Sequence, residues 1–324
     1  MANVFLTGAS GFLGAHLLRE LIARGYSVRA LSRRSETDTP IAAAGGTPVR
    51  AALDDVASLK AAMRGCDAVF HAAADTSMWK SHAARQTATN VQGTANMLAA
   101  AESLGVKAFV HTSSISAYSQ LVEGVLTEST PQRGVESWIN YEVTKHQSEK
   151  LVRESNLPWI VLNPSHILGP GDRHNWARLV MMIDQRTLPG IPPGVGAFAD
   201  VREVAKAHVH AWELRRFGQC YLVGGAKASF AEFVHKVGAA LGRRTPRGTI
   251  PQWALMLVGR GKDLLSRVTG TEPDITPESA RMTSYTLLVD SSKAERELGY
   301  VQTPLDALLA DTLAWMKGEG MVAR

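Results

Sequence analysis

Tyr141 and Lys145 stand four residues apart in a segment whose pattern predicts a helix from about residue 138 to 153. Residues at this spacing share one face of a helix, so both side chains point the same way. A phenol with a pKa of about 10 is a poor acid–base group at neutral pH, and a nearby ammonium lowers that pKa by favouring the phenolate. The pair therefore predicts proton transfer by Tyr141, although such a pair alone is common on helices.

Two serines precede that helix at the end of a predicted strand. Residues 108–111 form a short apolar run, and Thr112, Ser113 and Ser114 follow it directly. Open α/β sheets bind ligands at the carboxyl edge of their strands, so these hydroxyls would emerge where a substrate binds. Their place in the chain strengthens the catalytic interpretation of the tyrosine and lysine.

A glycine-rich turn near the N-terminus predicts a dinucleotide site. It follows the first apolar run and opens a helical pattern. Glycines allow a tight turn and let backbone N–H groups approach a pyrophosphate, whose charge the helix N-terminus favours. The position in the first strand–helix–strand unit favours this interpretation over a purely structural turn. The expected contacts are Gly8, Ser10, Gly11, Phe12, Leu13 and Gly14.

Ser32, Arg33 and Arg34 occupy the place, about twenty residues after that turn, where an NAD site carries an acidic residue for the ribose 2′-hydroxyl. No carboxylate stands there to repel a 2′-phosphate, and a guanidinium binds phosphate through parallel hydrogen bonds. We therefore expect NADP(H) rather than NAD(H), with Arg33 as the first contact and Arg34 as the second. A solvated surface pair is the alternative.

These groups must be positioned by an α/β fold, because short apolar runs alternate with helical patterns. A Rossmann-type doubly wound parallel sheet is expected in an NADP-binding domain over residues 1–165, with a returning strand near 195–225. Residues 166–324 combine Gly- and Pro-rich turns with helical patterns and predict a smaller, mostly helical, substrate-binding region. The predicted strands are 4–6, 27–31, 48–51, 68–71, 108–111 and 159–162.

Composition narrows the class of protein. The 324 residues suffice for a large core, and two cysteines, Cys66 and Cys220, are too few for a disulfide framework, which fits a reducing cytoplasm. No basic segment precedes a long apolar run, so neither a signal peptide nor a membrane partner is expected. The net charge is +5, but the basic residues are dispersed along the sequence, which argues against a nucleic-acid partner. We interpret the charge as a mild attraction for anionic ligands.

Together these motifs resemble the extended short-chain dehydrogenase/reductase family, within the NAD-dependent epimerase/dehydratase superfamily. The resemblance covers nearly the whole chain and its motifs are highly specific in combination. Besides the three glycines, Tyr141 and Lys145, it rests on His71-Ala72-Ala73, Asn90 to Thr94, Ser113-Ser114, Asn163 to Pro170, Ser292 to Ala294 and Leu298 to Tyr300.

The resemblance implies a role for each residue of this set. Tyr141 would donate or accept the proton, and Lys145 would bind the nicotinamide ribose and the phenol. Ser114 would bind the substrate oxygen, with Ser113 and Ser116 as alternatives. Leu53 and Asp54 are expected near the adenine. Further cofactor contacts are expected from Ala72, Ala73, Ala74, Pro164, Ser165, His166 and Ile167.

Three positions depart from the family pattern. Ala52 stands where many members carry an acidic residue that reads adenine, so that contact is expected from Asp54 or the backbone. Sugar-nucleotide epimerases usually have asparagine where His166 aligns and arginine where Gly196 stands. Losing both groups argues against a bound nucleotide diphosphate, whose charges need partners. The Asn163-Pro164 start instead resembles dihydroflavonol, cinnamoyl-CoA and methylglyoxal reductases.

The resemblance thus implies an NADP(H)-dependent oxidoreductase that interconverts a ketone or aldehyde and an alcohol by hydride transfer. The alternatives are a sugar-nucleotide epimerase or dehydratase and a non-catalytic NADP-binding regulator, which the intact Tyr141/Lys145/Ser114 set disfavours. A homodimer through helices at about 86–103 and 138–153 is also implied, although these Ala-rich faces could equally pack within one subunit.

The remaining candidates come from position alone. Low-ranked substrate contacts are Met78, Trp79, Ser116, Trp138 and His166, for which packing is an equal alternative. Two-residue spacing points His208 and His210 to different faces of a helix, so no metal site is expected. Asn90 is expected to hold a backbone bend, with positioning of a proton-relay water as the alternative, and His71 is expected to be structural.

Overall fold

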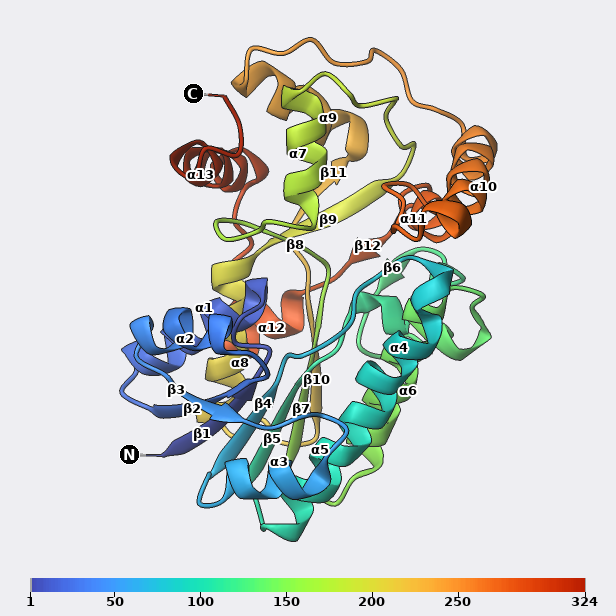
Figure 1. Cartoon of the computed structure of the whole chain (residues 1–324). Helices are drawn as coiled ribbons and strands as arrows, with labels where there is room; N and C mark the ends of the chain where they lie inside the picture. Colours follow the sequence, from blue (N-terminus) through green and yellow to red (C-terminus); the bar gives the residue numbers. More distant parts are fainter. Residues whose placement is uncertain (1, 324) are drawn as a thin grey trace.

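A seven-stranded parallel sheet forms the lower half of the protein in Figure 1. This computed structural model describes residues 2–323, with the side chain of residue 267 outside the description. The strand order is β10-β7-β5-β4-β1-β2-β3. These strands are β1 (Asn3–Thr7), β2 (Ser27–Ser32), β3 (Thr47–Arg50), β4 (Ala68–His71), β5 (Ala108–Thr112), β7 (Trp159–Pro164) and β10 (Gln219–Val223).

The predicted strands and the doubly wound sheet are confirmed. Strands of such a sheet are buried on both faces, which explains their short apolar runs. In β1, Val4 and Leu6 face one hydrophobic core, whereas Phe5 faces the other. The expected return to the sheet is β10, which pairs with β7. Residues 195–200 also form a strand, but they pair elsewhere.

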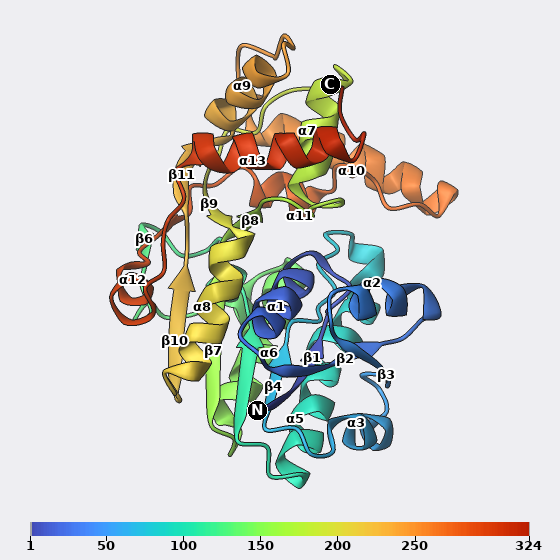
Figure 2. The same cartoon turned by 90° about the vertical axis from the view of Figure 1, so that its left-hand side faces the viewer.

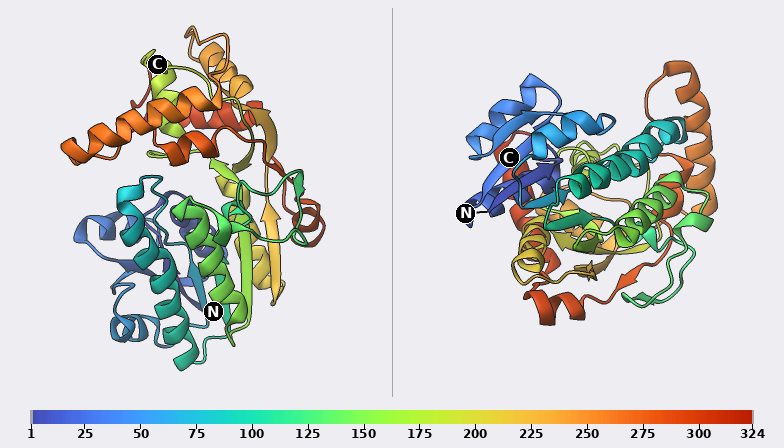
Figure 3. Two further views of the ribbon diagram at one scale, coloured as in Figure 1. Left: turned by 90° about the vertical axis from the view of Figure 1, so that its right-hand side faces the viewer. Right: turned by 90° about the horizontal axis from the view of Figure 1, so that it is seen from below.

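Helices cover both faces of this sheet. Figure 2 shows α1 and α8 on one face, and the left panel of Figure 3 shows α5 and α6 on the other. The first face carries α1 (Phe12–Ala23), α2 (Asp38–Ala43), α8 (Val201–Glu213) and α12 (Ser292–Leu298). The second carries α3 (Val56–Met63), α5 (Gly93–Ser103) and α6 (Asn140–Glu154).

Short elements join the strands to these helices at the carboxyl edge of the sheet. One of them, η3 (Ala88–Gln92), is a π-helical turn directly before α5. The other short elements are η1 (Ser35–Thr37), η2 (Lys80–His82), α4 (Ala83–Thr87), η4 (Ile115–Ala117) and η5 (Gly134–Glu136). A separate two-stranded sheet pairs β6 (Val125–Leu126) with β12 (Leu288–Val289).

A second lobe stands above the carboxyl edge in Figure 1. Its core is a three-stranded sheet of β8 (His166–Leu168), β9 (Val195–Asp200) and β11 (Ala226–Ser229). Helices α7 (Trp176–Asp184), α9 (Phe230–Ala240) and α13 (Leu305–Gly318) share its hydrophobic core. The lobe also holds α10 (Gln252–Thr269) and α11 (Pro277–Met282). The C-terminal region is mostly helical, as predicted, and adds this small sheet.

Candidate active site

The turn after β1 brings three backbone segments into contact. Gly8 has a φ of +78°, and a Cβ there would lie 2.8 Å from the backbone carbon of Ala72. A Cβ on Gly14 would lie 1.9 Å from the Gly8 carbonyl oxygen. The Gly11 amide donates to that oxygen at 2.8 Å. Glycine is therefore required at 8 and 14 by the turn itself and by the close approach of α1.

The N-terminus of α1 fits a bound pyrophosphate. The N-cap residue is Gly11, so no side chain caps this end of the helix, and the first turn contains no acidic residue. Backbone N–H groups there are left for an anion, which the helix dipole also favours. Ser10 and Gly11 are exposed and Phe12 is half-buried, whereas Leu13 packs into the core and can offer a ligand only its backbone.

The edge where β2 and β3 end carries three guanidinium groups. Arg33 and Arg34 are exposed directly after β2. Arg50 donates to the Asp38 carboxylate at 2.6 and 2.5 Å and to the Ser32 hydroxyl at 2.8 Å. The Arg50 hydrogen bonds lower the pKa of Asp38. Sequence reasoning missed Arg50, because its place beside Ser32 depends on the register of β2 against β3.

His71 joins β1, β4 and α5 below the cofactor turn. Its Nδ1 lies 2.8 Å from the Thr7 hydroxyl and its Nε2 lies 3.1 Å from the Thr94 hydroxyl. The Ala73 amide donates to the same Thr7 oxygen at 3.1 Å. Burial, with a smaller effect of Lys145, lowers the pKa of His71 to about 3. A neutral ring with both nitrogens bound confirms the structural role expected for this residue.

The residues predicted near the adenine of the cofactor, Leu53 and Asp54, are less buried than His71. Leu53 packs on α5, where a Cβ on Gly93 would lie 3.2 Å from the Leu53 Cβ. The Asn96 amide donates to the Leu53 carbonyl at 2.7 Å, which fixes the backbone beside the cleft. Asp54 and Ala74 are exposed. Their contacts with adenine and cofactor stay predictions.

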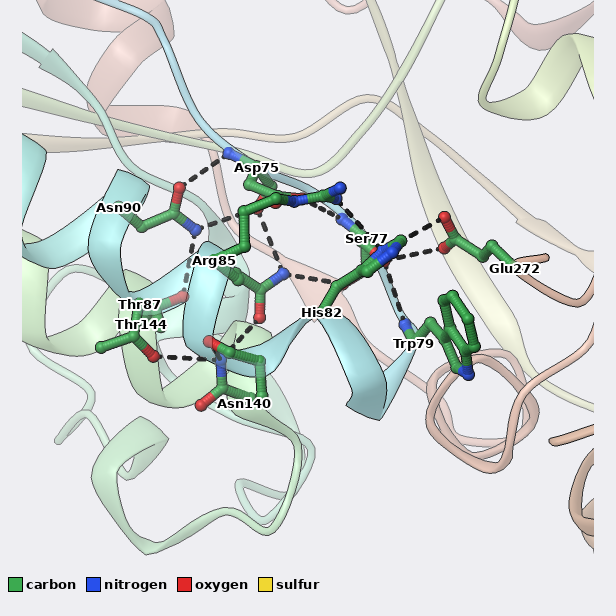
Figure 4. Close-up of polar contacts among 12 residues, drawn as sticks. Asp75, Ser77, Trp79, His82, Arg85, Thr87, Asn90, Asn140, Thr144 and Glu272 are labelled. Carbon is green, nitrogen blue, oxygen red and sulfur yellow. Dashed lines mark hydrogen bonds and ion pairs between the residues drawn. The ribbon is translucent and has the colours of Figure 1, made fainter. Parts of the chain in front are cut away.

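Asn90 connects the loop after β4 to α6, the helix that carries Tyr141 and Lys145 (Figure 4). Its Oδ1 accepts from the Asp75 amide at 2.7 Å, and its Nδ2 donates to the Asp75 carbonyl at 2.9 Å and to the Thr144 hydroxyl at 3.1 Å. The Asn140 amide donates to Gln86 at 2.9 Å and joins α4 to the start of α6. Asn90 thus holds a backbone bend, as predicted.

The three predicted catalytic side chains lie together at the carboxyl end of β5. The Ser114 hydroxyl lies beside the phenol of Tyr141, whose pKa it lowers, and accepts from the Ser116 amide at 3.1 Å. One turn further along α6, the Lys145 ammonium donates to the Thr112 carbonyl at 2.9 Å. Ser114 and Lys145 are buried and Tyr141 is half-buried.

Burial dominates the electrostatics of this set. It raises the pKa of Tyr141, which the hydrogen bond with Ser114 opposes. It also lowers the pKa of Lys145 to about 8, which Glu149 opposes. From the spacing of Tyr141 and Lys145, we expected the lysine ammonium to lower the pKa of the tyrosine phenol. That expectation is wrong for the protein groups alone, because desolvation disfavours the phenolate and the ammonium donates to Thr112.

The Glu149 carboxylate, which the sequence analysis did not identify, accepts hydrogen bonds from residues that lie next to the predicted catalytic side chains. The side chain of Glu149 is fully buried. Its Oε2 accepts from the Ser113 hydroxyl and the Asn163 amide, both at 2.6 Å, and its Oε1 accepts from the Gln132 amide at 2.6 Å. Asn163 also donates to the Ser114 carbonyl at 3.1 Å. Glu149 therefore fixes the backbone that presents the Ser114 hydroxyl.

This network separates the adjacent serines. Ser113 donates to Glu149, whereas Ser114 lies beside Tyr141 and lowers the pKa of its phenol. The Ser116 side chain is buried in η4. Glu149 stands four residues after Lys145 on the same helix face, so extending the four-residue spacing along α6 by one step would have found it.

The wall of the second lobe that begins at His166 is aromatic. The His166 ring centroid lies 4.8 Å from that of Trp176, 5.7 Å from that of Phe198 and 6.0 Å from that of Phe230. A Cβ on Gly196 would lie 2.4 Å from His166 Cδ2. The two departures at 166 and 196 are therefore physically linked, because the histidine ring fills the space that a side chain at 196 needs. Burial lowers the pKa of His166 to about 4, so the ring is neutral.

Comparison with known proteins agrees with this geometry. The NAD dependent epimerase/dehydratase family matches residues 4–224, which is more than half of the chain. The chain belongs to this family. Its members include a ketoreductase of 4-hydroxy-2-methyl-3-oxo-4-farnesyl-3,4-dihydroquinoline-1-oxide from Stigmatella aurantiaca, 32% identical over 94% of this chain and 95% of that protein.

Two further relatives show how widely this epimerase/dehydratase fold is used. Sterol demethylase protein B of Methylococcus capsulatus is 31% identical over 99% of this chain and 100% of its own length. The UDP-glucuronic acid 4-epimerase of Bacillus cereus, solved with UDP-glucuronic acid and NAD, superposes with a TM-score of 0.78 at 20% identity, covering 98% and 99% of the two chains. Dihydroflavonol 4-reductase is also among the activities named for relatives, as the sequence resemblance implied.

Membership of the NAD dependent epimerase/dehydratase family makes the chain an enzyme and supports a pyridine nucleotide as its cofactor. The residues predicted beside the nicotinamide occupy the junction of the two lobes. Pro164 ends β7 and is buried, and the Ser165 hydroxyl donates to the Ala197 carbonyl at 2.8 Å. Ile167 lies in β8 and is half-buried. The hydroxyl of Ser165 is thus bound within the protein.

The three residues predicted to form an apolar wall, Met78, Trp79 and Trp138, differ in burial, and their contact with a substrate stays a prediction. Trp79 is 8% exposed, and its indole N–H donates to Asp263 in α10 at 3.0 Å. Trp138 is 53% exposed. Met78 is half-buried. Packing, the alternative that the sequence left open, accounts for Trp79.

Proposed function

We propose that this enzyme is an NADP(H)-dependent oxidoreductase that interconverts an apolar ketone or aldehyde and the corresponding alcohol. The observation that carries the proposal is the placement of Ser114, Tyr141 and Lys145 together at the carboxyl end of β5, where Ser114 lies beside the Tyr141 phenol and the Lys145 ammonium, one turn away, donates to the Thr112 carbonyl. Two neighbouring hydroxyl donors can bind a carbonyl oxygen, and they bind it better as it gains negative charge.

The proposed chemistry divides the work among these side chains. The nicotinamide supplies or accepts the hydride when it is bound. Ser114 donates a hydrogen bond to the substrate oxygen without changing charge, and Tyr141 gives its proton to that oxygen or takes it back. Lys145 would bind the nicotinamide ribose, and its positive charge would favour the phenolate that is left when Tyr141 gives its proton to the substrate oxygen. Glu149 and Asn163 keep the Ser114 backbone in place through the contacts described above.

The preference for NADP(H) rests on the edge formed by β2 and β3. Arg33 and Arg34 are exposed, and Asp38, an acidic residue beside that edge, is already bound by Arg50. A carboxylate held in this way repels a 2′-phosphate less than a free one. The two exposed guanidinium groups favour the additional phosphate of NADP(H).

The preference for an apolar substrate rests on the lobe wall. A nucleotide diphosphate needs cationic or amide partners when it leaves water. Here His166 is neutral, Gly196 has no side chain, and the adjoining groups are Trp176, Phe198 and Phe230. The ketoreductase of Stigmatella aurantiaca, whose substrate name contains a farnesyl group, is a relative of matching character.

One experiment separates the three readings of this site. Purified protein is mixed with NADPH and a panel of aromatic and aliphatic ketones, aldehydes and sugar nucleotides, while cofactor absorbance and products are followed. The proposal expects net NADPH oxidation with an apolar carbonyl. Conversion of a sugar nucleotide without net cofactor consumption would establish an epimerase instead. Tight cofactor binding without any turnover across the panel would favour a regulator.

We also propose a homodimer through α5 and α6. These helices cover one face of the sheet and contact each other within the subunit, so only their outer surfaces remain for a partner. Light scattering at micromolar concentration should give twice the monomer mass. A monomer would contradict the proposal.

A further inference from the structure

Helix α10 presents an apolar stripe to solvent. Its large exposed side chains recur at the spacing of one helix face, and they form a row along the outer side of the second lobe. The left panel of Figure 3 shows α10 at the periphery of this lobe. The exposed fractions are 68% for Trp253, 58% for Leu257, 66% for Leu264, 63% for Leu265 and 86% for Val268.

The opposite face of α10 is packed in the normal way. Leu255 and Ser266 are buried, and Gly259 approaches α11 so closely that a Cβ would lie 2.8 Å from the Thr276 backbone. Asp263 holds the indole of Trp79. The helix therefore has a fixed orientation, and its apolar stripe is the side turned away from the protein. Single exposed apolar residues are ordinary, but a contiguous row marks an interaction surface.

Positive charge accompanies the stripe. Residues 243–269 contain six basic residues and one acidic residue. Two of the basic side chains are paired with carboxylates outside this segment, Arg243 with Asp184 and Lys262 with Asp274. Arg244, Arg247 and Arg260 are exposed, and none has an ion pair among residues 2–323. The sequence-based description of the charge as dispersed is therefore wrong for this segment.

We propose that α10 lies on an anionic lipid surface, with its apolar stripe between the acyl chains and with Arg260, together with Arg244 and Arg247 of the segment before the helix, at the phosphates. An apolar helix face combined with a cationic border is the combination that binds such interfaces. No helix within residues 2–323 has the length and apolar composition to cross a bilayer, so the contact lies along the surface. This proposal replaces the expectation that the protein has no membrane partner.

A second copy of the chain fits this surface less well. Pairing two α10 stripes would bring the exposed arginines of two copies together, and like charges oppose such contacts. An anionic lipid surface instead neutralises the arginines while it covers the apolar residues. The proposal uses no residue of the catalytic set, so it stands or falls independently of the proposed function.

The test measures binding of the full chain to vesicles. Sedimentation with phosphatidylcholine vesicles is compared with sedimentation in the presence of phosphatidylglycerol. Binding should require the anionic lipid and weaken as salt is added, because the electrostatic part is screened. Absence of binding to anionic vesicles at moderate salt would overturn the proposal.

Three variants locate the contact. Leu257→Ser/Leu264→Ser should reduce the partition coefficient about tenfold or more by removing apolar area. Arg244→Gln/Arg247→Gln/Arg260→Gln should reduce it by a similar factor for anionic vesicles only. Leu214→Ser, at a leucine that is 51% exposed in another part of the molecule, should bind like the wild type.

Two results would reject α10 as the contact. One is wild-type binding by both α10 variants, which would place the lipid contact elsewhere. The other is self-association of the wild type that Leu257→Ser/Leu264→Ser abolishes in light scattering without lipid, which would make a second copy the occupant. All variants lie on the surface, and circular dichroism together with NADPH binding verifies that each is folded.

Discussion

The two sides of the active site are held in place by different interactions. At the end of β5, Glu149 and Asn163 fix Ser113 and the Ser114 backbone through buried hydrogen bonds of 2.6 to 3.1 Å, and Lys145 is fixed by its hydrogen bond to the Thr112 carbonyl. The wall that begins at His166 is fixed by ring packing and by the missing side chain at Gly196.

The difference reflects what each side has to define. Catalysis needs a few oxygen and nitrogen atoms at definite positions, and directional hydrogen bonds with buried partners provide this. Discrimination among substrates needs a shape and a polarity, which close-packed apolar side chains provide. Substitutions on the first side should therefore change rates, and substitutions on the second should change packing and substrate range.

Tyr141→Phe should have the largest effect. Loss of one oxygen should leave the fold and NADPH binding nearly intact and lower hydride transfer by about a hundredfold to ten-thousandfold. Single-turnover kinetics on an identified carbonyl substrate measures this. Tyr26→Phe is the control, because its hydroxyl bonds Glu213 at the surface. Wild-type hydride transfer by folded, NADPH-loaded Tyr141→Phe would show that another group donates the proton.

Arg33→Ala/Arg34→Ala tests the cofactor edge. Charge-assisted contacts of this kind are worth about 1.5 to 3 kcal/mol, so the affinity ratio of NADPH to NADH should fall by about tenfold to a hundredfold. Dissociation constants for both cofactors measure the ratio. Arg64→Ala, another exposed arginine, is the control. Equal wild-type affinities, or a ratio that the double variant leaves unchanged, would remove these arginines from cofactor selection.

Gly196→Ala tests the packed side. The added Cβ overlaps His166, so the free energy of unfolding should fall by about 1 to 3 kcal/mol. His166→Ala in the same chain should recover much of that loss, since adjacent sites are not additive. Gly248→Ala is the matched control, because nothing lies within 4 Å of its Cβ position. Equal unfolding midpoints for the two alanine variants would contradict the linkage between 166 and 196.

Glu149→Gln should have the smallest but most diagnostic effect. Lys145 must be protonated to act, and its pKa is about 8, so kcat/KM should fall as the pH rises through that value. Removing the carboxylate removes a group that raises this pKa, so the decline should begin at lower pH. Glu154→Gln, at an exposed position of the same helix, is the control. A uniform loss at every pH would indicate a purely structural role for Glu149.

The features that could be predicted from the sequence are those that depend on residues close together in the chain. Apolar runs located the strands, and the glycines at 8, 11 and 14 located the cofactor turn, because both signals lie within a few residues. Tyr141 and Lys145 were placed together by the period of one helix. The parallel, doubly wound class of the central sheet followed from the alternation of strands and helices.

Contacts across the chain escaped that reasoning. Arg50 reaches Ser32 only through the pairing of β2 with β3, and Asn163 reaches Glu149 across β7 and α6. The direction of the Tyr141 pKa shift depends on burial, which a helix pattern does not reveal. The overlap between His166 and residue 196 required the second sheet, where β8 pairs with β9.

The contacts between the loop after β4 and the second lobe have a consequence for local unfolding. Trp79 donates to Asp263 at 3.0 Å, and Ser77 donates to Glu272 at 2.8 Å (Figure 4 shows the latter). Breaking these contacts exposes both segments at once, so they should open cooperatively. In hydrogen–deuterium exchange, the amides of residues 75–82 and of 263–272 should lose protection at the same rate, as parts of one folding unit that spans the two lobes.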